Sequence, residues 1–159
     1  IFLLGIFSTF VFFRAFSNTS FSSIILINNL FIFTDNRDWS NVEKCFAEKV
    51  HFDMTSMGAE STALQTPRQI TDMWDDGLKN IEGVHHQTGN LKIDVSDEKA
   101  VAFCYGKASH FKKTNSGKNT RTFVGSYNFH LTKSNDDWRI DSFKFTLKYV
   151  DGNLNLETD

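Results

Sequence analysis

Apolar and polar residues alternate over long runs in the second half of the chain, and short polar segments separate these runs. Alternation of this kind is typical of β-strands that have one buried face. Because the connecting segments are short, we expect consecutive strands to pair as an antiparallel meander. The pattern predicts strands at residues 85–95, 100–112, 121–133 and 138–150.

The first half of the chain predicts helices instead. Apolar residues recur near helical spacing over residues 20–33, and a second, shorter helix fits residues 38–47. A third helix begins at Pro67, because Thr66 can cap it and a glutamine occupies the capping-box position three residues later. Residues 50–54 alternate as a short strand. Helices followed by a curved antiparallel sheet predict an α+β domain whose helices close one side of the sheet.

The start of the chain differs from the rest. Residues 1–13 form an apolar run that is shorter than the roughly 20 apolar residues that span a bilayer. Three interpretations are open: the remainder of a signal or anchor, a translated non-coding extension, or a helix that packs on the domain. We expect three parts, namely an apolar extension (1–19), the folded domain (20–151) and a polar tail (152–159).

Composition narrows the class of protein. A net charge of −2 and a pI near 6.2 argue against a nucleic-acid binder. The 17 phenylalanines and the single proline favour curved strands around an apolar interior. We expect Cys45 and Cys104 to be buried, reduced thiols. We therefore expect a cytoplasmic protein that does not bind membranes, or a secreted or tethered one if residues 1–13 are the remainder of a signal or anchor.

Alternation sorts the strand residues by face. His110 shares a face with small residues, as expected where a sheet lines a cavity; these are Ala102, Cys104, Gly106 and Ala108. On the next strand, Ser126, Asn128 and His130 share one face, and the opposite face carries Phe123, Tyr127, Phe129 and Leu131. Alternation alone does not decide which of these two faces meets the helices.

Two adjacent histidines, His85 and His86, stand at the head of the first long strand. Histidine is the side chain whose ordinary pKa, roughly 6.5, allows proton transfer near neutral pH. Strict alternation places His85 on the face of Leu91 and Ile93, but a bulge at residues 88–90 would reverse this. The pattern therefore leaves open which histidine points inward.

Six segments agree in order and approximate spacing with those of a known family: Thr34–Trp39, Val50–Asp53, His85–Asn90, Ser109–Phe111, Tyr127–His130 and Trp138–Ile140. They resemble the SnoaL-like, scytalone dehydratase-like family of the nuclear transport factor two-like superfamily. The resemblance covers most of the chain. It implies a cone-shaped, mostly antiparallel sheet whose hollow is closed by the N-terminal helices.

The resemblance also implies a site. Asp35 falls on the family's catalytic aspartate and His86 on the histidine that this aspartate orients, which favours His86 over His85 as the inward residue. His110 falls on a second active-site histidine, and Asn128 on a substrate-binding asparagine. To the substrate-binding candidates we add residues on the same face or in the third helix: Ser126, His130 and Trp74.

The chain departs from the family at two positions. The family's dehydratase uses tyrosines to polarise a substrate carbonyl, and this chain has Thr34 and Met54 at the matching places. Losing such donors removes stabilisation of a developing enolate. Tyr105 or Tyr149, each on a predicted strand, could supply the missing hydroxyl group in place of those tyrosines.

The resemblance implies, and these residue types fit, a cofactor-free lyase or isomerase that abstracts a proton next to a carbonyl of a small apolar or polyketide-like molecule. The Asp35–His86 pair would be the base, and His110 would donate to a leaving hydroxyl. A metal site formed by these three residues is an open alternative by ligand type. So is a non-catalytic domain that binds a small ligand or a partner. Homodimers through the sheet face are common in the superfamily, and we expect one here.

Overall fold

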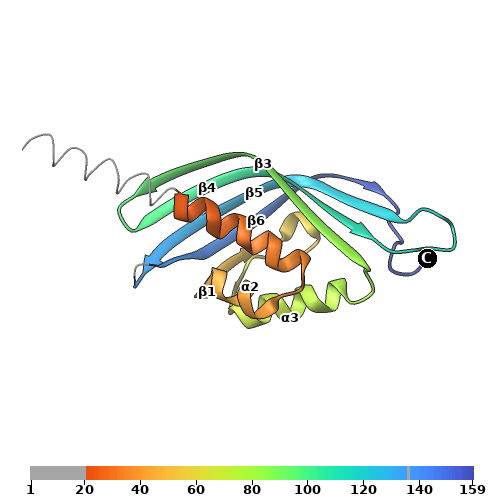
Figure 1. The fold of residues 1–159 in the computed structure, drawn as a ribbon, viewed down its shortest axis with the longest axis horizontal. Coiled ribbons are helices and arrows are strands. Elements are labelled where there is room, and N and C mark those ends of the chain that lie inside the picture. Colours follow the sequence, from red (N-terminus) through yellow and green to blue (C-terminus); the bar gives the residue numbers. More distant parts are fainter. Residues whose placement is uncertain (1–20, 136) are drawn as a thin grey trace, which may run out of the picture.

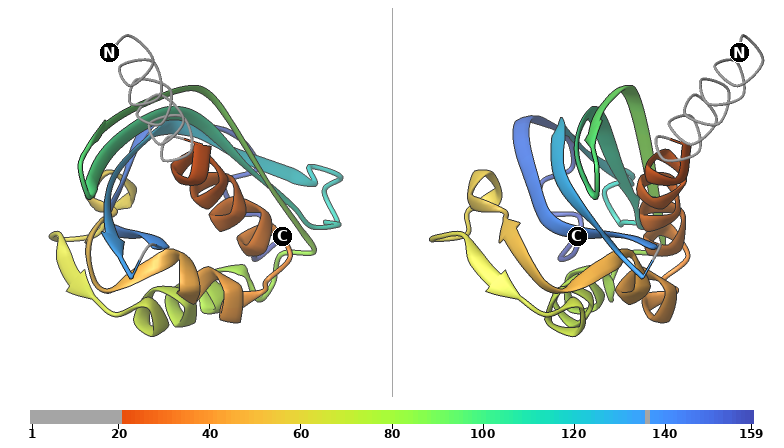
Figure 2. Two further views of the ribbon diagram at one scale, coloured as in Figure 1. Left: turned by 60° about the vertical axis from the view of Figure 1, so that its left-hand side comes forward. Right: turned by 90° about the vertical axis from the view of Figure 1, so that its left-hand side faces the viewer.

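A curved sheet arches over a helix in the computed structural model, which describes residues 21–135 and 137–159 (Figure 1). The elements are a helix over residues 21–35, α2 (Trp39–Cys45), β1 (Phe46–Asp53), the short 3-10 helix η1 (Thr55–Met57), β2 (Ala63–Gln65), α3 (Pro67–Leu78), β3 (Gly83–Ser96), β4 (Lys99–Phe111), β5 (Thr120–Ser134) and β6 (Asp137–Gly152). Figure 2 shows the first helix inside the hollow of the sheet and α3 across its open side. The predicted α+β class is confirmed. The predicted extension over residues 1–19 lies outside the described residues.

The strands of the described sheet lie in the order β2-β1-β6-β5-β4-β3. The four strands β3 to β6 form the antiparallel meander that the alternating pattern predicts. β1 runs parallel to β6, so that Phe46 lies beside Ile140 and Phe52 beside Phe143. The sequence pattern did not predict this parallel pairing or the three-residue edge strand β2, because neither produces a long alternating run.

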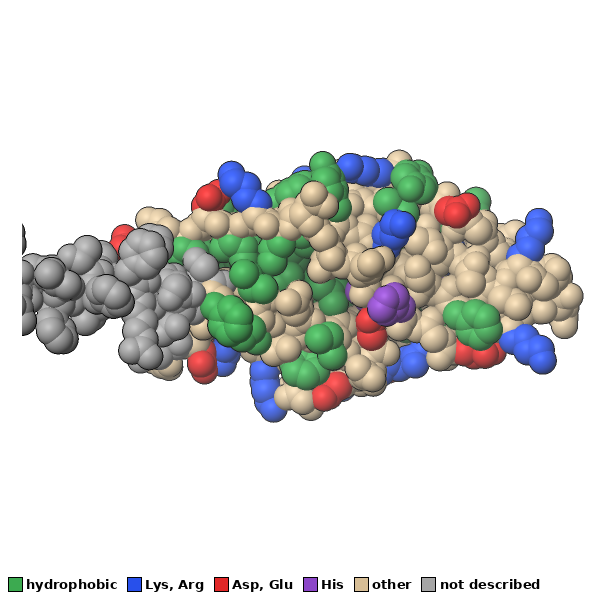
Figure 3. Space-filling view, turned by 45° about the horizontal axis from the view of Figure 1, so that its top comes forward, with side chains coloured by type: hydrophobic (Ala, Val, Ile, Leu, Met, Phe, Trp, Pro, Cys, Tyr) green, Lys and Arg blue, Asp and Glu red, His purple; other side chains and the backbone are tan. Residues whose placement is uncertain are grey.

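The helix of residues 21–35 supplies the apolar contacts that fill the hollow. Leu30 is fully buried, and the ring of Phe31 lies 4.8 Å from that of Tyr127 and 6.3 Å from that of Phe129, measured between centroids. Aromatic burial of this kind is a large part of the driving force for folding. Three large apolar residues remain exposed on this helix: Phe21, Ile25 and Ile32. Figure 3 shows hydrophobic side chains gathered on one face of the molecule. No helix among the described residues is long and apolar enough to cross a membrane.

A bulge in β3 decides which of its residues face the hollow. The pairing of β3 with β4 shifts register between Gly89 and Lys92, next to the position where the sequence left a bulge open. Asn90 has a φ of 55°, a left-handed conformation that asparagine tolerates better than most residues. The inward positions are therefore those of His86 before the bulge and Ile93 after it, which resolves the alternation left open by the sequence.

The last residues fold back onto the domain. Leu156 is fully buried in a cluster with Leu78 at the end of α3 and with Ile81. Lys112 donates to the backbone oxygen of Glu157 over 2.9 Å. The segment predicted as a polar tail thus covers one end of the sheet, close to the end of β4.

Gly106 makes room for the central aromatic residue of β5. A Cβ atom at this position would lie 2.2 Å from Cε2 of Tyr127, well inside van der Waals contact. Small residues precede it on the same face of β4, where Ala102 and Cys104 are buried. The small face predicted for this strand is therefore needed for the packing of a large ring against it.

We expect Gly106→Ala to lower the free energy of unfolding by about 1–3 kcal/mol, because the added methyl group must displace the ring of Tyr127. Urea denaturation measures the change. Gly89→Ala is the matched control in the neighbouring strand, since a Cβ there meets no atom within 4 Å. Equal effects of the two substitutions would show that the close approach to Tyr127 is not the cause.

Candidate active site

Asp35 ends the first described helix, and its carboxylate contacts β3. Its Oδ1 lies 2.6 Å from Nδ1 of His86, and the backbone N–H of His86 donates to Oδ2 over 2.9 Å. Phe31, one helical turn before Asp35, stacks on the imidazole with ring centroids 5.0 Å apart and planes inclined by 26°. The ring is therefore held at its edge by a carboxylate and on its face by an aromatic ring.

This contact determines the tautomer of His86. A carboxylate only accepts hydrogen bonds, so Nδ1 carries the proton and donates it to Asp35. The remaining nitrogen, Nε2, then has a free lone pair in the neutral ring. His86 lines the pocket and its side chain is 12% exposed, whereas that of His85 is 76% exposed. The inward histidine is therefore His86.

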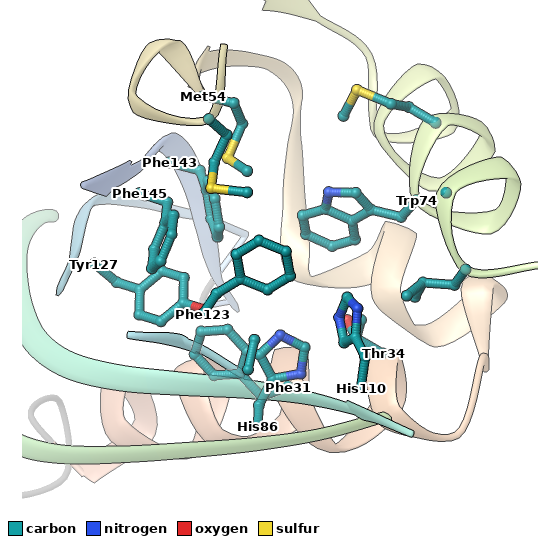
Figure 4. A pocket seen from close by; sticks show the side chains of 15 residues that line it. Phe31, Thr34, Met54, Trp74, His86, His110, Phe123, Tyr127, Phe143 and Phe145 are labelled. Carbon is teal, nitrogen blue, oxygen red and sulfur yellow. The ribbon is translucent and has the colours of Figure 1, made fainter. Parts of the chain in front are cut away.

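A pocket of about 210 Å³ lies between the first helix, η1, α3 and the inner face of the sheet. Its lining is mainly aromatic rings and methionines: Phe31, Met54, Met57, Met73, Trp74, Leu78, Ala108, Phe123, Phe143 and Phe145. Figure 4 shows the rings of His86 and His110 close together on one side of this cavity, with Tyr127 facing it from the sheet. Few polar side chains in an apolar pocket are typical of a small-molecule site.

His110 lies near the end of β4 and its ring faces the same pocket as His86. Burial, and after it the positive charge of Arg121, lower the pKa of His110 from 6.5 to about 4. Nη2 of Arg121 lies 3.4 Å from Nδ1 of His110. At neutral pH this histidine is therefore an uncharged imidazole rather than an imidazolium.

Tyr127 is a polar group of the pocket that sequence reasoning missed. Its ring lies 4.8 Å from those of Phe31 and Phe145, and the side chain is 4% exposed. Burial raises the pKa of the phenol above its ordinary value, so the hydroxyl keeps its proton and can donate. The signal was in the alternation, which placed a tyrosine among phenylalanines on one face of β5.

Three of the predicted substrate-binding residues do line the pocket: Trp74, and Thr34 and Met54, which stand where the family's dehydratase has tyrosines. Trp74 lies on α3 and also packs against Phe143, with centroids 5.7 Å apart. The Thr34 hydroxyl donates to the backbone oxygen of Leu30 over 2.7 Å, so this contact already engages it. Met54 contributes only an apolar surface.

The structure places four predicted substrate-binding residues outside the pocket. Asn128, His130 and Tyr105 are exposed on the outer face of the sheet, and Ser126 is buried but does not line the cavity. The prediction that these four residues bind a substrate in the pocket is therefore wrong, and the choice of face that alternation left open is decided. The physical reason is that Tyr127 and its phenylalanine neighbours bury far more apolar area than Asn128 could, so their face turns toward the helix.

Neither cysteine is an activated nucleophile. Cys45 and Cys104 are free and buried as predicted, and burial raises the pKa of each thiol to about 11. The thiolate is the reactive form, so this shift makes both thiols inert. Within residues 21–135 and 137–159, no group of three or more His, Cys, Asp or Glu side chains is arranged to hold a metal ion.

Residues 26–144 match the family model of the SnoaL-like domain. The chain belongs to this family. The family assignment agrees with the resemblance that the sequence motifs indicated, and with the nuclear transport factor two-like architecture of the sheet and helices. A comparison with curated proteins gave no match.

Solved structures with the same architecture support the fold of this SnoaL-like domain. The Kfla4162 protein from Kribbella flavida superposes with a TM-score of 0.83 at 16% identity, over 90% of this chain and 99% of that one. A candidate scytalone dehydratase from Novosphingobium aromaticivorans gives 0.74 at 13% identity, over 85% and 87%. The hexachlorocyclohexane dehydrochlorinase LinA-type3 from Novosphingobium barchaimii gives 0.71 at 13%, over 89% and 92%. At these identities the likeness shows the fold alone.

The lowered pKa of His110 makes the stability of the SnoaL-like domain depend on pH. Between about 4 and 6.5 the unfolded state binds more protons at this residue, so the free energy of unfolding falls as the pH falls through this range. We expect the free energy of unfolding of His110→Gln to fall less than that of the wild type over this pH range, with a difference on the order of 2 kcal/mol. Urea denaturation at several pH values measures it. The exposed His51 provides a control, His51→Gln, which should keep the wild-type pH dependence.

Proposed function

We propose that this protein is a cofactor-free lyase or isomerase that abstracts a proton next to a carbonyl group of a small, mostly apolar molecule. The observation that carries the proposal is the contact between Asp35 and His86 at the wall of an apolar pocket. Fold alone does not specify an activity, so the proposal rests on the side chains in the site.

His86 has the features of an oriented general base. Asp35 accepts the proton of Nδ1, leaves Nε2 free, and stabilises the imidazolium that forms when Nε2 takes a proton. The stacked ring of Phe31 restricts rotation of the imidazole. A base that is held in one orientation loses little entropy on reaching the transition state.

Two further donors face the pocket at positions suited to oxygen atoms of a substrate. When the proton leaves carbon, the electron pair moves toward the carbonyl and negative charge develops on its oxygen. The Tyr127 hydroxyl or the N–H of neutral His110 can stabilise that oxygen by a hydrogen bond. In a dehydration the new double bond forms as the C–O bond breaks, and the proton held by His86 converts the departing hydroxide into water.

The pocket lining supports the substrate class. Phenylalanine, tryptophan and methionine side chains surround the cavity, so the ligand should be apolar apart from one or two oxygen atoms. Dehydratase and dehydrochlorinase are words in the names of proteins that share the fold. Both names denote eliminations, in which a proton and a leaving group are lost from neighbouring carbons.

A non-catalytic, ligand-binding role is the second candidate. It is favoured by Thr34 and Met54, which stand where the resemblance places the carbonyl-polarising tyrosines and which supply no free donor here. The same pocket would then bind an apolar molecule without turnover. Substitutions at the Asp35–His86 pair distinguish the two roles.

We expect Asp35→Asn to lower the turnover of a substrate found by screening β-hydroxy ketones by about 10³–10⁴-fold, because an amide cannot stabilise the imidazolium. The affinity for an unreactive analogue, measured by calorimetry, should change little. His85→Ala is the matched control, because this exposed neighbour also lies near Asp35 but outside the pocket. Bound analogue with no turnover of any screened compound by the wild type would favour the binding role instead.

We expect Tyr127→Phe to lower kcat by about 10²-fold, because it removes one donor from the developing oxyanion. The apolar ring is kept, so the binding of an analogue without the carbonyl should be unchanged. Tyr105→Phe removes a hydroxyl from the outer face of the sheet and should leave both values at the wild-type level. An unaltered kcat in Tyr127→Phe would assign carbonyl polarisation to another group.

A further inference from the structure

We propose that Arg121 and Glu157 are positioning residues that hold His110 as one neutral tautomer, with its Nε2–H presented to the pocket. The catalytic consequence rests on the proposed function, whereas the tautomer itself does not. Neither residue was a candidate in the sequence, because they lie 36 positions apart and carry no motif.

The three side chains form a continuous chain of contacts. His110 on β4 and Arg121 on β5 are direct partners in the strand register, so the sheet itself brings them together. Nη2 of Arg121 lies 3.4 Å from Nδ1 of His110. On its other side the guanidinium donates through Nη1 to Oε2 of Glu157 over 2.8 Å, and through Nη2 to Oε1.

The chemistry of arginine determines the direction of the hydrogen bond. A guanidinium has only donors, so Nδ1 of His110 must be the acceptor. The proton of the neutral ring then belongs to Nε2. Figure 4 shows the His110 ring directed into the cavity near His86, where this N–H can meet an oxygen of a bound molecule.

Burial makes this arrangement persistent. The Arg121 side chain is 11% exposed and that of Glu157 is 33% exposed, so solvent screens their pairing less than that of a surface pair. The ring of Phe123 covers Arg121, with Cζ 4.9 Å from the ring centroid. It also lies 5.3 Å from the His110 ring.

The C-terminal segment holds Glu157 in place. Leu156 beside it is fully buried, and Lys112 donates to the backbone oxygens of Glu157 and Asp159. The side chain of Asp159 in turn accepts from Asn153 over 2.9 Å. Residues beyond the matched segment 26–144 thereby contribute to the candidate site.

Four charged or titratable groups surround His110 and act on it in opposite directions. Arg121 and His86 disfavour its protonation, and Glu157 and Asp35 favour it. The two positioning residues therefore have opposite expected effects when each is removed alone. A substitution that merely opened the pocket to water would shift both variants in the same direction.

Nitrogen-15 NMR of the full chain with labelled histidine tests the inference, because the two ring nitrogens report tautomer and protonation separately. In the wild type we expect His110 to carry its proton on Nε2. Arg121→Met should mix the two tautomers and raise the pH of half-protonation toward 6.5. In Glu157→Gln, a smaller fraction of His110 should be protonated at the pH where the wild-type residue is half-protonated. Arg68→Met is the matched control, since this exposed arginine pairs with Glu43 and Asp72 away from the pocket.

A proton on Nδ1 of His110 in the wild type would overturn the inference, even if Arg121→Met failed to fold. A rise of the midpoint in both Arg121→Met and Glu157→Gln would overturn it as well. If the NMR results are as expected and no elimination substrate is turned over, the proposed function fails while the positioning role stands. With a substrate in hand, Arg121→Met should lower kcat more than it raises KM.

Discussion

The carboxylate of Asp35 joins the helix inside the hollow to the edge of the curved sheet. β3 is the last strand of the sheet, so its outer backbone groups have no neighbouring strand. Asp35 accepts from one of these groups, the N–H of His86, and from the ring of the same residue. The Asp35 side chain therefore accepts a hydrogen bond from the backbone of the edge strand, attaches the end of the helix to that strand, and orients the His86 imidazole. Because a buried carboxylate is costly unless it is hydrogen-bonded, these three roles depend on one another.

In the remainder of the site, apolar rings pack against a few polar groups and determine how these are placed. Phe31 contacts both His86 and Tyr127, so the same ring supports the candidate base and the candidate donor. Gly106 allows Tyr127 to approach the neighbouring strand closely. Burial keeps the phenol and the His110 ring uncharged at neutral pH, which suits them to donating hydrogen bonds rather than to exchanging protons.

The C-terminal segment packs against the domain and reaches the candidate site. It lies beyond the strands of the meander, yet it buries Leu156 and places the Glu157 carboxylate beside Arg121. Arg121, paired with Glu157, contacts Nδ1 of His110, and Asp35 contacts Nδ1 of His86. The two histidines are thus supported by groups of opposite charge, a carboxylate for one and a guanidinium for the other. These opposite charges favour a proton on Nδ1 of His86 and on Nε2 of His110.

The sequence by itself determined the local elements and indicated the family. Alternation located the four long strands, the capping residues located the start of α3, and the glycine before Asn90 marked the bulge. These features follow from periods and turn chemistry that act within a few residues. The motifs also pointed to Asp35, His86 and His110. In the structure the two histidines line one pocket, and Asp35 contacts His86.

Only the tertiary structure decided which face of each strand met the helix and which distant residues became partners. Alternation separated Tyr127 from Asn128 but could not choose the inner one, since that choice depends on the apolar area buried against Phe31. The parallel pairing of β1 with β6 and the contact of Arg121 with Glu157 join segments far apart in the chain. Such contacts leave no periodic signal, because they arise from the curvature of the whole sheet and the return of the C-terminal segment.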